Sequence, residues 1–240
     1  MGYMTQKELK NIARDKMLGQ YGTAIGAFLF MRFVLMIALG ASSSLFANHG
    51  IMFMIASFII VLFEGIFAYG ELSIYLKISV GMPTDMTDVV SAFKGSADKA
   101  IKSRLILMMI LYGCMYSQMG IKYICNTFDT GAENVITKIS GILLFVLCIW
   151  LLLTYSQIMY FLHDFSEITV KEACIRSRKL MQGNKLTLLS MYIGFIPIYI
   201  VGVLSWMVGL YFLHPYVKMT LTEFYLDRVK KSEKKDGANI

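Results

Sequence analysis

Charged residues are scarce in this chain of 240 residues, and the usual catalytic motifs are absent from it. Asp, Glu, Lys and Arg make up 16% of the residues, whereas a soluble domain carries about 25%. The sequence has no HExxH zinc motif, no Walker phosphate loop, no GxSxG nucleophile motif and no histidines at metal-ligand spacing. Its four cysteines form no CxxC pair. We therefore expect no enzyme, no catalytic residue, no metal ligand and no cofactor.

Long apolar runs take the place of the missing charges, and 57% of the residues are hydrophobic. A helix that crosses a bilayer needs about 20 apolar residues. Four runs of this length lie at about 21–45, 51–79, 105–125 and 139–162. A fifth stretch, 186–228, is long enough for two helices, divided by a turn near 205–209. The pattern predicts an all-α fold: a polytopic membrane protein with six transmembrane helices paired into three hairpins.

Lysine and arginine are unevenly distributed among the connections between these runs. Nineteen of them lie in the N-terminal segment, the second and fourth connections and the C-terminal tail, whereas the other connections hold only Lys122 and Lys138. Cytoplasmic loops of membrane proteins carry the excess of basic residues. The distribution predicts cytoplasmic N- and C-termini and short outer loops. Because the basic residues serve this topology, we do not expect the chain to bind nucleic acid.

One polar segment occurs twice, at 5–20 and at 169–184, with six identical residues in sixteen. Each copy opens with a Thr followed three residues later by a Glu, which is the capping box of a helix N-terminus. Each helix has one apolar stripe, and we expect it to lie flat on the cytoplasmic surface with that stripe toward the acyl chains. A glycine ends each copy and allows a turn into the bilayer. The residues of this motif are Thr5, Glu8, Gly19, Thr169, Glu172 and Gly183.

A weaker third copy starts at Thr84 and ends at Gly95, which predicts three units that each combine an interfacial helix with a hairpin. The units lie at about 5–79, 84–164 and 169–230, within a single transmembrane domain at 1–230. The alternative is that helices which precede a span converge on this composition without being repeats. The charged segment 231–240 predicts a disordered basic tail.

Ionisable residues inside the expected spans are the candidate functional residues: Arg32, Glu64, Glu71, Lys218 and Glu223. A charge in mid-bilayer costs at least about 2.5 kcal/mol on insertion scales, so it needs a partner or water. Glu71 and Glu223 lie toward the cytoplasmic ends of their spans, where they can reach water. Arg32 and Glu64 are equally distant from the first hairpin turn, near residue 48, so we expect an ion pair between them. The alternative is a polar cavity that both residues border, with Glu64 facing Lys218.

The C-terminal part of the chain carries the pattern Ser-Arg-x-x-Met-x-Gly-Asn, then Gly, Pro-Tyr and Phe-Tyr. The matching residues are Ser177, Arg178, Met181, Gly183, Asn184, Gly209, Pro215, Tyr216, Phe224 and Tyr225. With the N-terminal ELKNIARDKMLGQY, this pattern resembles an uncharacterised bacterial membrane family, domain of unknown function 975. The resemblance implies a multi-span protein of the bacterial plasma membrane, and it implies no activity.

Three classes of function fit this sequence. The first is a membrane-embedded accessory or envelope protein that binds anionic lipid headgroups, or a protein partner in the membrane, through its basic cytoplasmic side. The alternatives are a small transporter or channel component with a site near the intramembrane charges, and, least favoured, an intramembrane or lipid-modifying enzyme. A polar cavity lined by Arg32, Glu64 and Lys218 would favour transport, whereas a dry helix bundle would favour the accessory protein.

Overall fold

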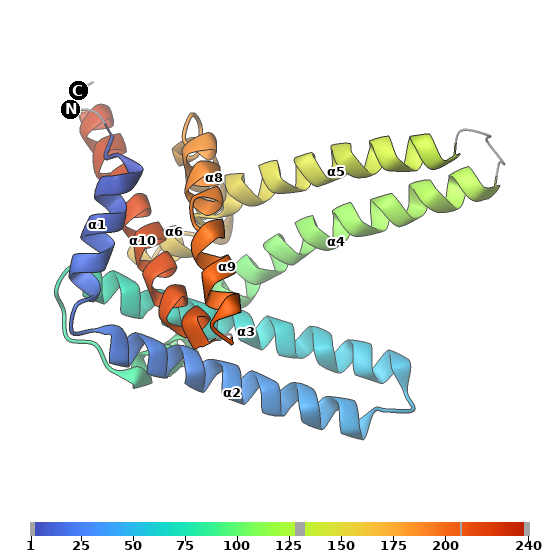
Figure 1. The fold of residues 1–240 in the computed structure, drawn as a ribbon, viewed down its shortest axis with the longest axis horizontal. Coiled ribbons are helices and arrows are strands. Elements are labelled where there is room, and N and C mark those ends of the chain that lie inside the picture. Colours follow the sequence, from blue (N-terminus) through green and yellow to red (C-terminus); the bar gives the residue numbers. More distant parts are fainter. Residues whose placement is uncertain (1–2, 128–132, 207, 238–240) are drawn as a thin grey trace.

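The computed structural model describes residues 3–127, 133–206 and 208–237, and every regular element in these ranges is helical (Figure 1), which confirms the all-α class. The elements are α1 (Gln6–Met17), α2 (Tyr21–Leu45), α3 (Gly50–Ser79), the 3-10 helix η1 (Met86–Lys94), α4 (Ala97–Thr127), α5 (Glu133–Tyr155), α6 (Ile158–Asp164), α7 (Val170–Leu180), α8 (Lys185–Ile193), α9 (Ile196–Leu204) and α10 (Val208–Gly237).

Long apolar helices dominate the structure. Five helical stretches have the length and composition needed to cross a membrane: Tyr21–Leu45, Gly50–Ser79, Ala97–Cys125, Val135–Asp164 and Lys185–Leu204. The first four form two antiparallel hairpins, α2–α3 and α4–α5, which diverge from each other toward their tips (Figure 1). Their outward surfaces are almost entirely exposed apolar side chains, as expected where lipid replaces water.

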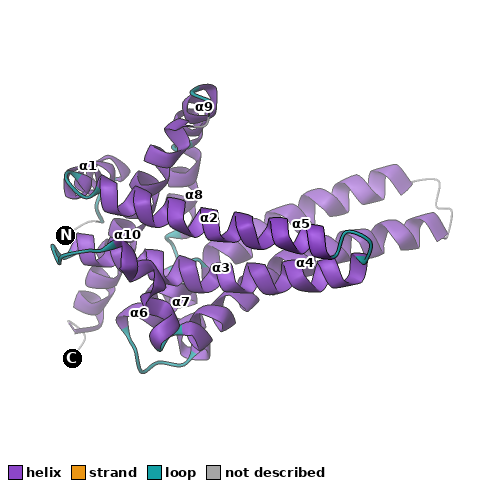
Figure 2. Cartoon of the chain, turned by 90° about the horizontal axis from the view of Figure 1, so that it is seen from below, coloured by secondary structure: helices purple, strands orange, loops and turns teal. Residues whose placement is uncertain are grey.

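The expected sixth span falls on α10, which is not among these five candidates. This helix contains Lys218, Glu223, Asp227 and Arg228, and such a run of charges keeps its mean hydropathy low. Figure 1 shows α8, α9 and α10 crossing the direction of the first two hairpins, and Figure 2 shows α9 projecting away from them. The expected third hairpin, formed by α8–α9 and α10, is therefore not aligned with the hairpins α2–α3 and α4–α5.

Two of the candidate spans are interrupted. The fourth divides between α5 and α6 at residues 156–157, and the fifth divides between α8 and α9 at residues 194–195. Pro197 lies in the first turn of α9, and proline cannot donate to, and clashes with, the carbonyl four residues earlier. That clash accounts for the break after Ile193.

The C-terminal helix α10 continues to Gly237. The part of the expected disordered tail at 231–237 is therefore helical, and residues 238–240 lie outside the described ranges.

The capping boxes at the starts of α1 and α7 are confirmed. Thr5 Oγ1 accepts from the Glu8 N–H at 3.3 Å, and the Glu8 carboxylate accepts from the Thr5 N–H at 2.7 Å. Thr169 and Glu172 repeat this geometry at 3.3 and 2.8 Å. These backbone hydrogen bonds, above all other causes, hold the pKa of both glutamates below the ordinary value.

The glycine turns behind these helices are confirmed as well. Gly19 and Gly183 adopt φ angles of 82° and 78°, the left-handed region in which glycine is favoured. The third copy differs, because its capping box is formed by Asp85 and Asp88 rather than by Thr84, and its helix is 3-10. Gly95 behind it is extended, with φ 169°.

The expectation that the apolar stripes of α1 and α7 face the acyl chains is wrong. On α1 the side chains of Leu9, Ala13 and Met17 are fully buried, because this face packs against α10 and α3. On α7 the corresponding Ala173 and Leu180 are buried against α6 and its neighbours. An apolar stripe needs a dry neighbour, and here protein supplies it rather than lipid.

Candidate functional site

Charged and polar side chains follow the contact between α3 and α10 and continue onto α1, α2 and α4. On α3 the acidic residues Glu64 and Glu71 are seven residues apart, which places them on the same face of the helix. Ser79, eight residues further on, is the last residue of α3. Glu64, Glu71 and Ser79 each belong to a separate group of polar contacts, and these three groups follow one another along α3.

The first group joins three helices through Glu64. Arg32 Nη1 on α2 lies 3.6 Å from Glu64 Oε1, so the expected contact is present, but Arg104 Nη2 on α4 lies closer to Glu64 Oε2, at 2.6 Å. Arg104 was not expected here, because its basic neighbours indicate a connection between spans rather than a span. Gly65 permits the contact: a Cβ on it would lie 2.7 Å from the Arg104 Cβ, so only glycine lets α4 approach this closely.

The second group is buried between α3, α10 and α2. His214 Nε2 lies 2.7 Å from Glu71 Oε1, and the Tyr75 hydroxyl donates to the same oxygen at 3.2 Å. The imidazole of His214 stacks on Phe28 with ring centroids 4.0 Å apart. Glu71 is only 3% exposed, so the expectation that it reaches water is wrong. The Lys218 ammonium, one turn beyond His214, adds an electrostatic attraction to Glu71.

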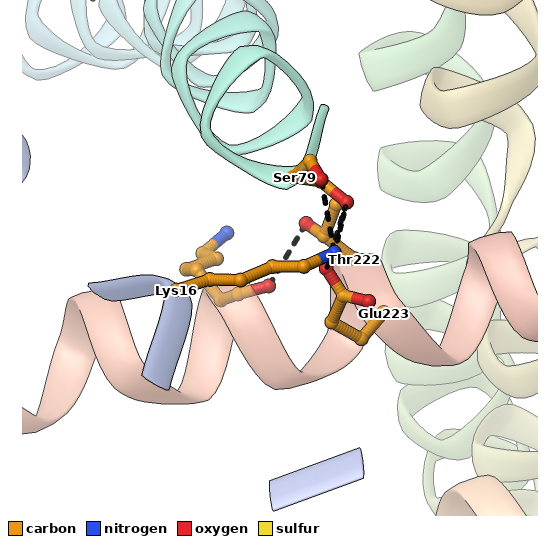
Figure 3. Close-up of polar contacts among 5 residues, drawn as sticks. Lys16, Ser79, Thr222 and Glu223 are labelled. Carbon is orange, nitrogen blue, oxygen red and sulfur yellow. Dashed lines mark hydrogen bonds and ion pairs between the residues drawn. The ribbon is translucent and has the colours of Figure 1, made fainter. Parts of the chain in front are cut away.

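The third group joins the ends of α1 and α3 to α10 (Figure 3). The Lys16 ammonium lies 2.8 Å from Glu223 Oε1 and also donates to the Ser79 carbonyl at 2.9 Å, while the Ser79 hydroxyl donates to Glu223 at 2.7 Å. Lys16 thereby satisfies a carbonyl at the C-terminus of α3 that has no partner within the helix. Thr222 donates to the Lys218 carbonyl at 3.0 Å. Glu223 is 7% exposed, so it too fails to reach water.

The remaining motif residues lie outside this polar face. Pro215 is inside α10, and Tyr216 packs edge-on against Phe195 at a centroid distance of 5.9 Å. Arg178 lies on the exposed side of α7. His214 and Lys16 could not be recognised as partners from the sequence, because each lies more than 140 residues from the acid it contacts.

The arrangement neutralises each acid with a nearby cation or hydrogen-bond donor. Paired charges of this kind are tolerated in apolar surroundings, whereas single ones are not. Within the described residues no three His, Cys, Asp or Glu side chains are close enough to hold a metal ion. Five cavities in the described part of the chain have linings that include none of Arg32, Glu64, Glu71, Lys218 and Glu223. Glu71 and Glu223 are buried in the helix packing, Glu64 is partly buried, and Arg32 is exposed with a side-chain exposure of 52%.

Comparison with known proteins yields one match. No curated protein and no solved structure matches the chain. A family model described as a protein of unknown function, DUF975, matches residues 1–233, which is nearly the whole length. The N-terminal segment, both hairpins and the motif from Arg178 to Tyr216 all lie inside this match. The chain therefore belongs to the DUF975 family of proteins of unknown function.

Proposed function

We propose that the protein is a membrane-embedded accessory or envelope protein of the bacterial plasma membrane, without catalytic activity. It binds anionic lipid headgroups, or a protein partner within the membrane, through its basic cytoplasmic side. The observation that carries this proposal is the pairing of the intramembrane charges. Glu64, Glu71 and Glu223 each contact a basic residue on another helix, so these charges hold helices together.

The cytoplasmic side offers basic side chains to such a partner. Lys7 and Arg14 lie on the exposed side of α1, and Lys171, Arg176 and Arg178 lie on the exposed side of α7. Each basic residue near an anionic membrane surface contributes about 1 kcal/mol to the attraction. Exposed Leu18, Ile175 and Leu186 flank these helices and would enter the acyl region.

We further propose six crossings, with α10 as the last and both termini in the cytoplasm. The distribution of Lys and Arg and the exposed apolar surface of α9 support this topology. Single cysteines at Asn48, Lys94 and Ser205, in a background without the four native cysteines, test it with a reagent that does not cross membranes. Labelling of positions 48 and 205 from outside, and of 94 only after permeabilisation, is expected. Protection of 205 from outside would mean that the third pair stays on the cytoplasmic side.

The lipid part of the proposal is tested by extracting the protein with native lipid and identifying the bound species by mass spectrometry. Enrichment of anionic lipids over their share of the bulk membrane, reduced in the variant Lys171→Gln with Arg176→Gln and Arg178→Gln, is the expected result. A matched variant that replaces Lys122 and Lys138, on the opposite side, should retain the enrichment. Bound lipid that mirrors the bulk, with no co-purified protein, contradicts the proposal.

Transport is the second candidate, because one feature favours it. Glu71 and His214 form a buried titratable pair, and acid–histidine chains of this kind carry protons in pumps and transporters. Proteoliposomes that contain the protein and a pH-sensitive dye distinguish the two functions. Faster collapse of an imposed pH gradient, abolished by Glu71→Gln and kept in Glu172→Gln, would replace the accessory function with proton-coupled transport.

A further inference from the structure

A small polar cavity lies between η1, the start of α4, the middle of α3 and the connection from α6 to α7. Its volume is about 240 Å³, and none of its walls belongs to the charge groups described above. A cavity needs about 10–15 Å³ of such volume to hold one water molecule, so this one has room for several. Its lining includes four hydroxyl groups, one ammonium and one imidazole: Ser73, Ser91, Ser96, Ser166, Lys99 and His163.

Ser73 is the residue that points to a ligand. It is 7% exposed, lines the cavity and makes no side-chain hydrogen bond to any residue in the described part of the chain. A serine inside a helix ordinarily donates to the carbonyl four residues earlier, as Ser117 does to Gly113 on α4. The Ser73 hydroxyl lines the cavity and is not hydrogen-bonded within the residues that the structure describes, so it is free to bond to whatever occupies the cavity.

Positive charge gathers at the rim of this cavity. Lys99 donates to the Ser166 carbonyl, which uses one of its three N–H groups and leaves two for a ligand. Ser96 precedes the first residue of α4, so the positive end of the helix dipole lies at the same wall. The hydroxyl of the buried Tyr69, which also lines the cavity, donates to the Leu162 carbonyl at 2.9 Å and fixes this part of the wall.

Two acidic residues, Asp98 and Asp164, lie near this cavity, and Asp98 is the one with a lysine partner. Asp98, in the first turn of α4, is held by Lys102 at 2.7 Å. Asp164 is 4.0 Å from the Nδ1 of His163, so the two stand side by side, with the imidazole lining the cavity. The Nε2 of that ring remains a possible donor to a ligand.

We propose that this cavity binds a phosphoryl group, either on a free phosphomonoester or in the headgroup of a phospholipid. A phosphate needs several convergent donors, and lysine, serine hydroxyls and a helix N-terminus are the usual ones. The remaining space accepts a group of the size of glycerol. If the occupant is a lipid, the inference rests on the proposed lipid-binding function and names its site; if it is a soluble phosphomonoester, the inference stands apart from that function.

The test is binding to the purified full-length protein in a zwitterionic detergent, with inorganic phosphate and glycerol 1-phosphate as probes and thermal stability and calorimetry as readouts. A ligand that binds only the folded state raises the Tm with concentration. Lys99→Gln and Ser73→Ala should each weaken binding roughly tenfold, the loss expected for a hydrogen bond to a charged group. Lys94→Gln on η1 and Ser117→Ala on α4 are the matched controls and should bind as the wild type does.

Nanodiscs distinguish the two sources of the phosphoryl group. Native mass spectrometry of the protein in discs of phosphatidylglycerol and phosphatidylcholine shows which lipid is retained, and Lys99→Gln should release it if the headgroup is the occupant. Retention of phosphatidylglycerol without binding of either soluble probe assigns the cavity to lipid. Binding of a soluble probe without retention of phosphatidylglycerol assigns it to a phosphomonoester. If no probe binds, or if the control variants lose binding equally, the inference is overturned. Should Ser73→Ala fail to fold, Lys99→Gln with its control decides alone, because Lys99 lies at the rim.

Discussion

Glu64 shows at the scale of one residue what the charges inside this protein do. Its two carboxylate oxygens contact guanidinium groups from different helices, one on α2 and one on α4. A single carboxylate thus connects the two hairpins. The shorter contact, to Arg104, is the one we expect to carry more of the interaction energy.

Charge-exchange variants test whether Arg104 stabilises the fold through Glu64 more than Arg32 does. Glu64→Arg alone places three guanidinium groups together and should destabilise the fold; a broken buried pair costs about 3–5 kcal/mol, and partial exposure of Glu64 lowers this to about 1–3 kcal/mol. Adding Arg104→Glu should restore more folded protein than adding Arg32→Glu, as measured by the monodisperse fraction on size-exclusion chromatography. Equal rescue by the two double variants would show that Arg32 contributes as much as Arg104.

The capping boxes give a second prediction at this scale. Thr5→Ala and Thr169→Ala each remove an acceptor for a first-turn N–H and should cost about 1 kcal/mol, visible as a lower Tm, whereas Thr→Ser at either position should retain most of the stability. Thr127→Ala, at the far end of α4, is the control without a cap. Because the folded-state pKa of Glu8 and of Glu172 is lowered, their contribution is complete above the unfolded pKa of about 4.3 and is lost as the pH falls further. If the Tm difference between wild type and Thr5→Ala does not shrink in acid, Glu8 is not part of the cap.

The sequence predicted features that depend on a few neighbouring residues. Thr5 and Glu8 are three residues apart, so the spacing alone identifies the cap. Gly19 follows from the same local pattern. The contact of His214 with Glu71 spans 143 residues, and nothing in the sequence relates the two before the helices are packed. Arg104 was misplaced because its neighbours are basic, although α4 begins earlier and carries it to the depth of Glu64.

At the scale of one helix, an apolar stripe indicates that a face must be covered but not what covers it. The stripe of α1 is covered by protein, and its side chains Leu9, Ala13 and Met17 are 0% exposed. Leu18, one residue past the end of α1, is 69% exposed. A lipid-facing residue and a core residue have the same hydropathy, so hydropathy alone could not separate them.

This difference predicts opposite outcomes for two leucines. Leu9→Ala leaves a cavity in the packed interface with α10 and should lower the free energy of unfolding by about 2–5 kcal/mol. Leu18→Ala should leave the stability of the detergent-solubilised protein nearly unchanged, since no protein packs on it. Thermal unfolding followed by intrinsic fluorescence measures both. An α1 that lay on lipid alone would give the same small effect for each.

Replacement by alanine should also have opposite effects at two glycines that lie inside long helices. A Cβ at Gly70 would lie 1.9 Å from the Val89 carbonyl oxygen, so Gly70→Ala forces η1 away from α3 and should destabilise the protein. Gly120 on α4 has no atom within 4 Å of that position. Gly120→Ala should therefore be neutral or stabilising, by up to about 1 kcal/mol of helix propensity. Thermal melts of the two variants compare them directly, and a stable Gly70→Ala would show that η1 is not held against α3.

For the whole molecule, local rules gave the number and type of most helices but not their mutual directions. Hydropathy identified the first four spans, and the turn glycines identified where the chain changes direction. The orientation of α8, α9 and α10 across the two hairpins depends on long-range contacts such as those of Lys16 and His214 (Figure 1). The sequence shows the charged residues of α10, but the position of this helix depends on the residues that pair with them.

The pairing of α1 with α10 also has a consequence for biosynthesis. Lys16 and Glu223 are 207 residues apart, and a ribosome adds about 5–20 residues per second, so roughly 10–40 s pass between their synthesis. During this time the stripe of Leu9, Ala13 and Met17 exists without the helix that later covers it. In the nascent chain the stripe must rest on the membrane surface or on a chaperone, and α10 displaces that first neighbour when it emerges.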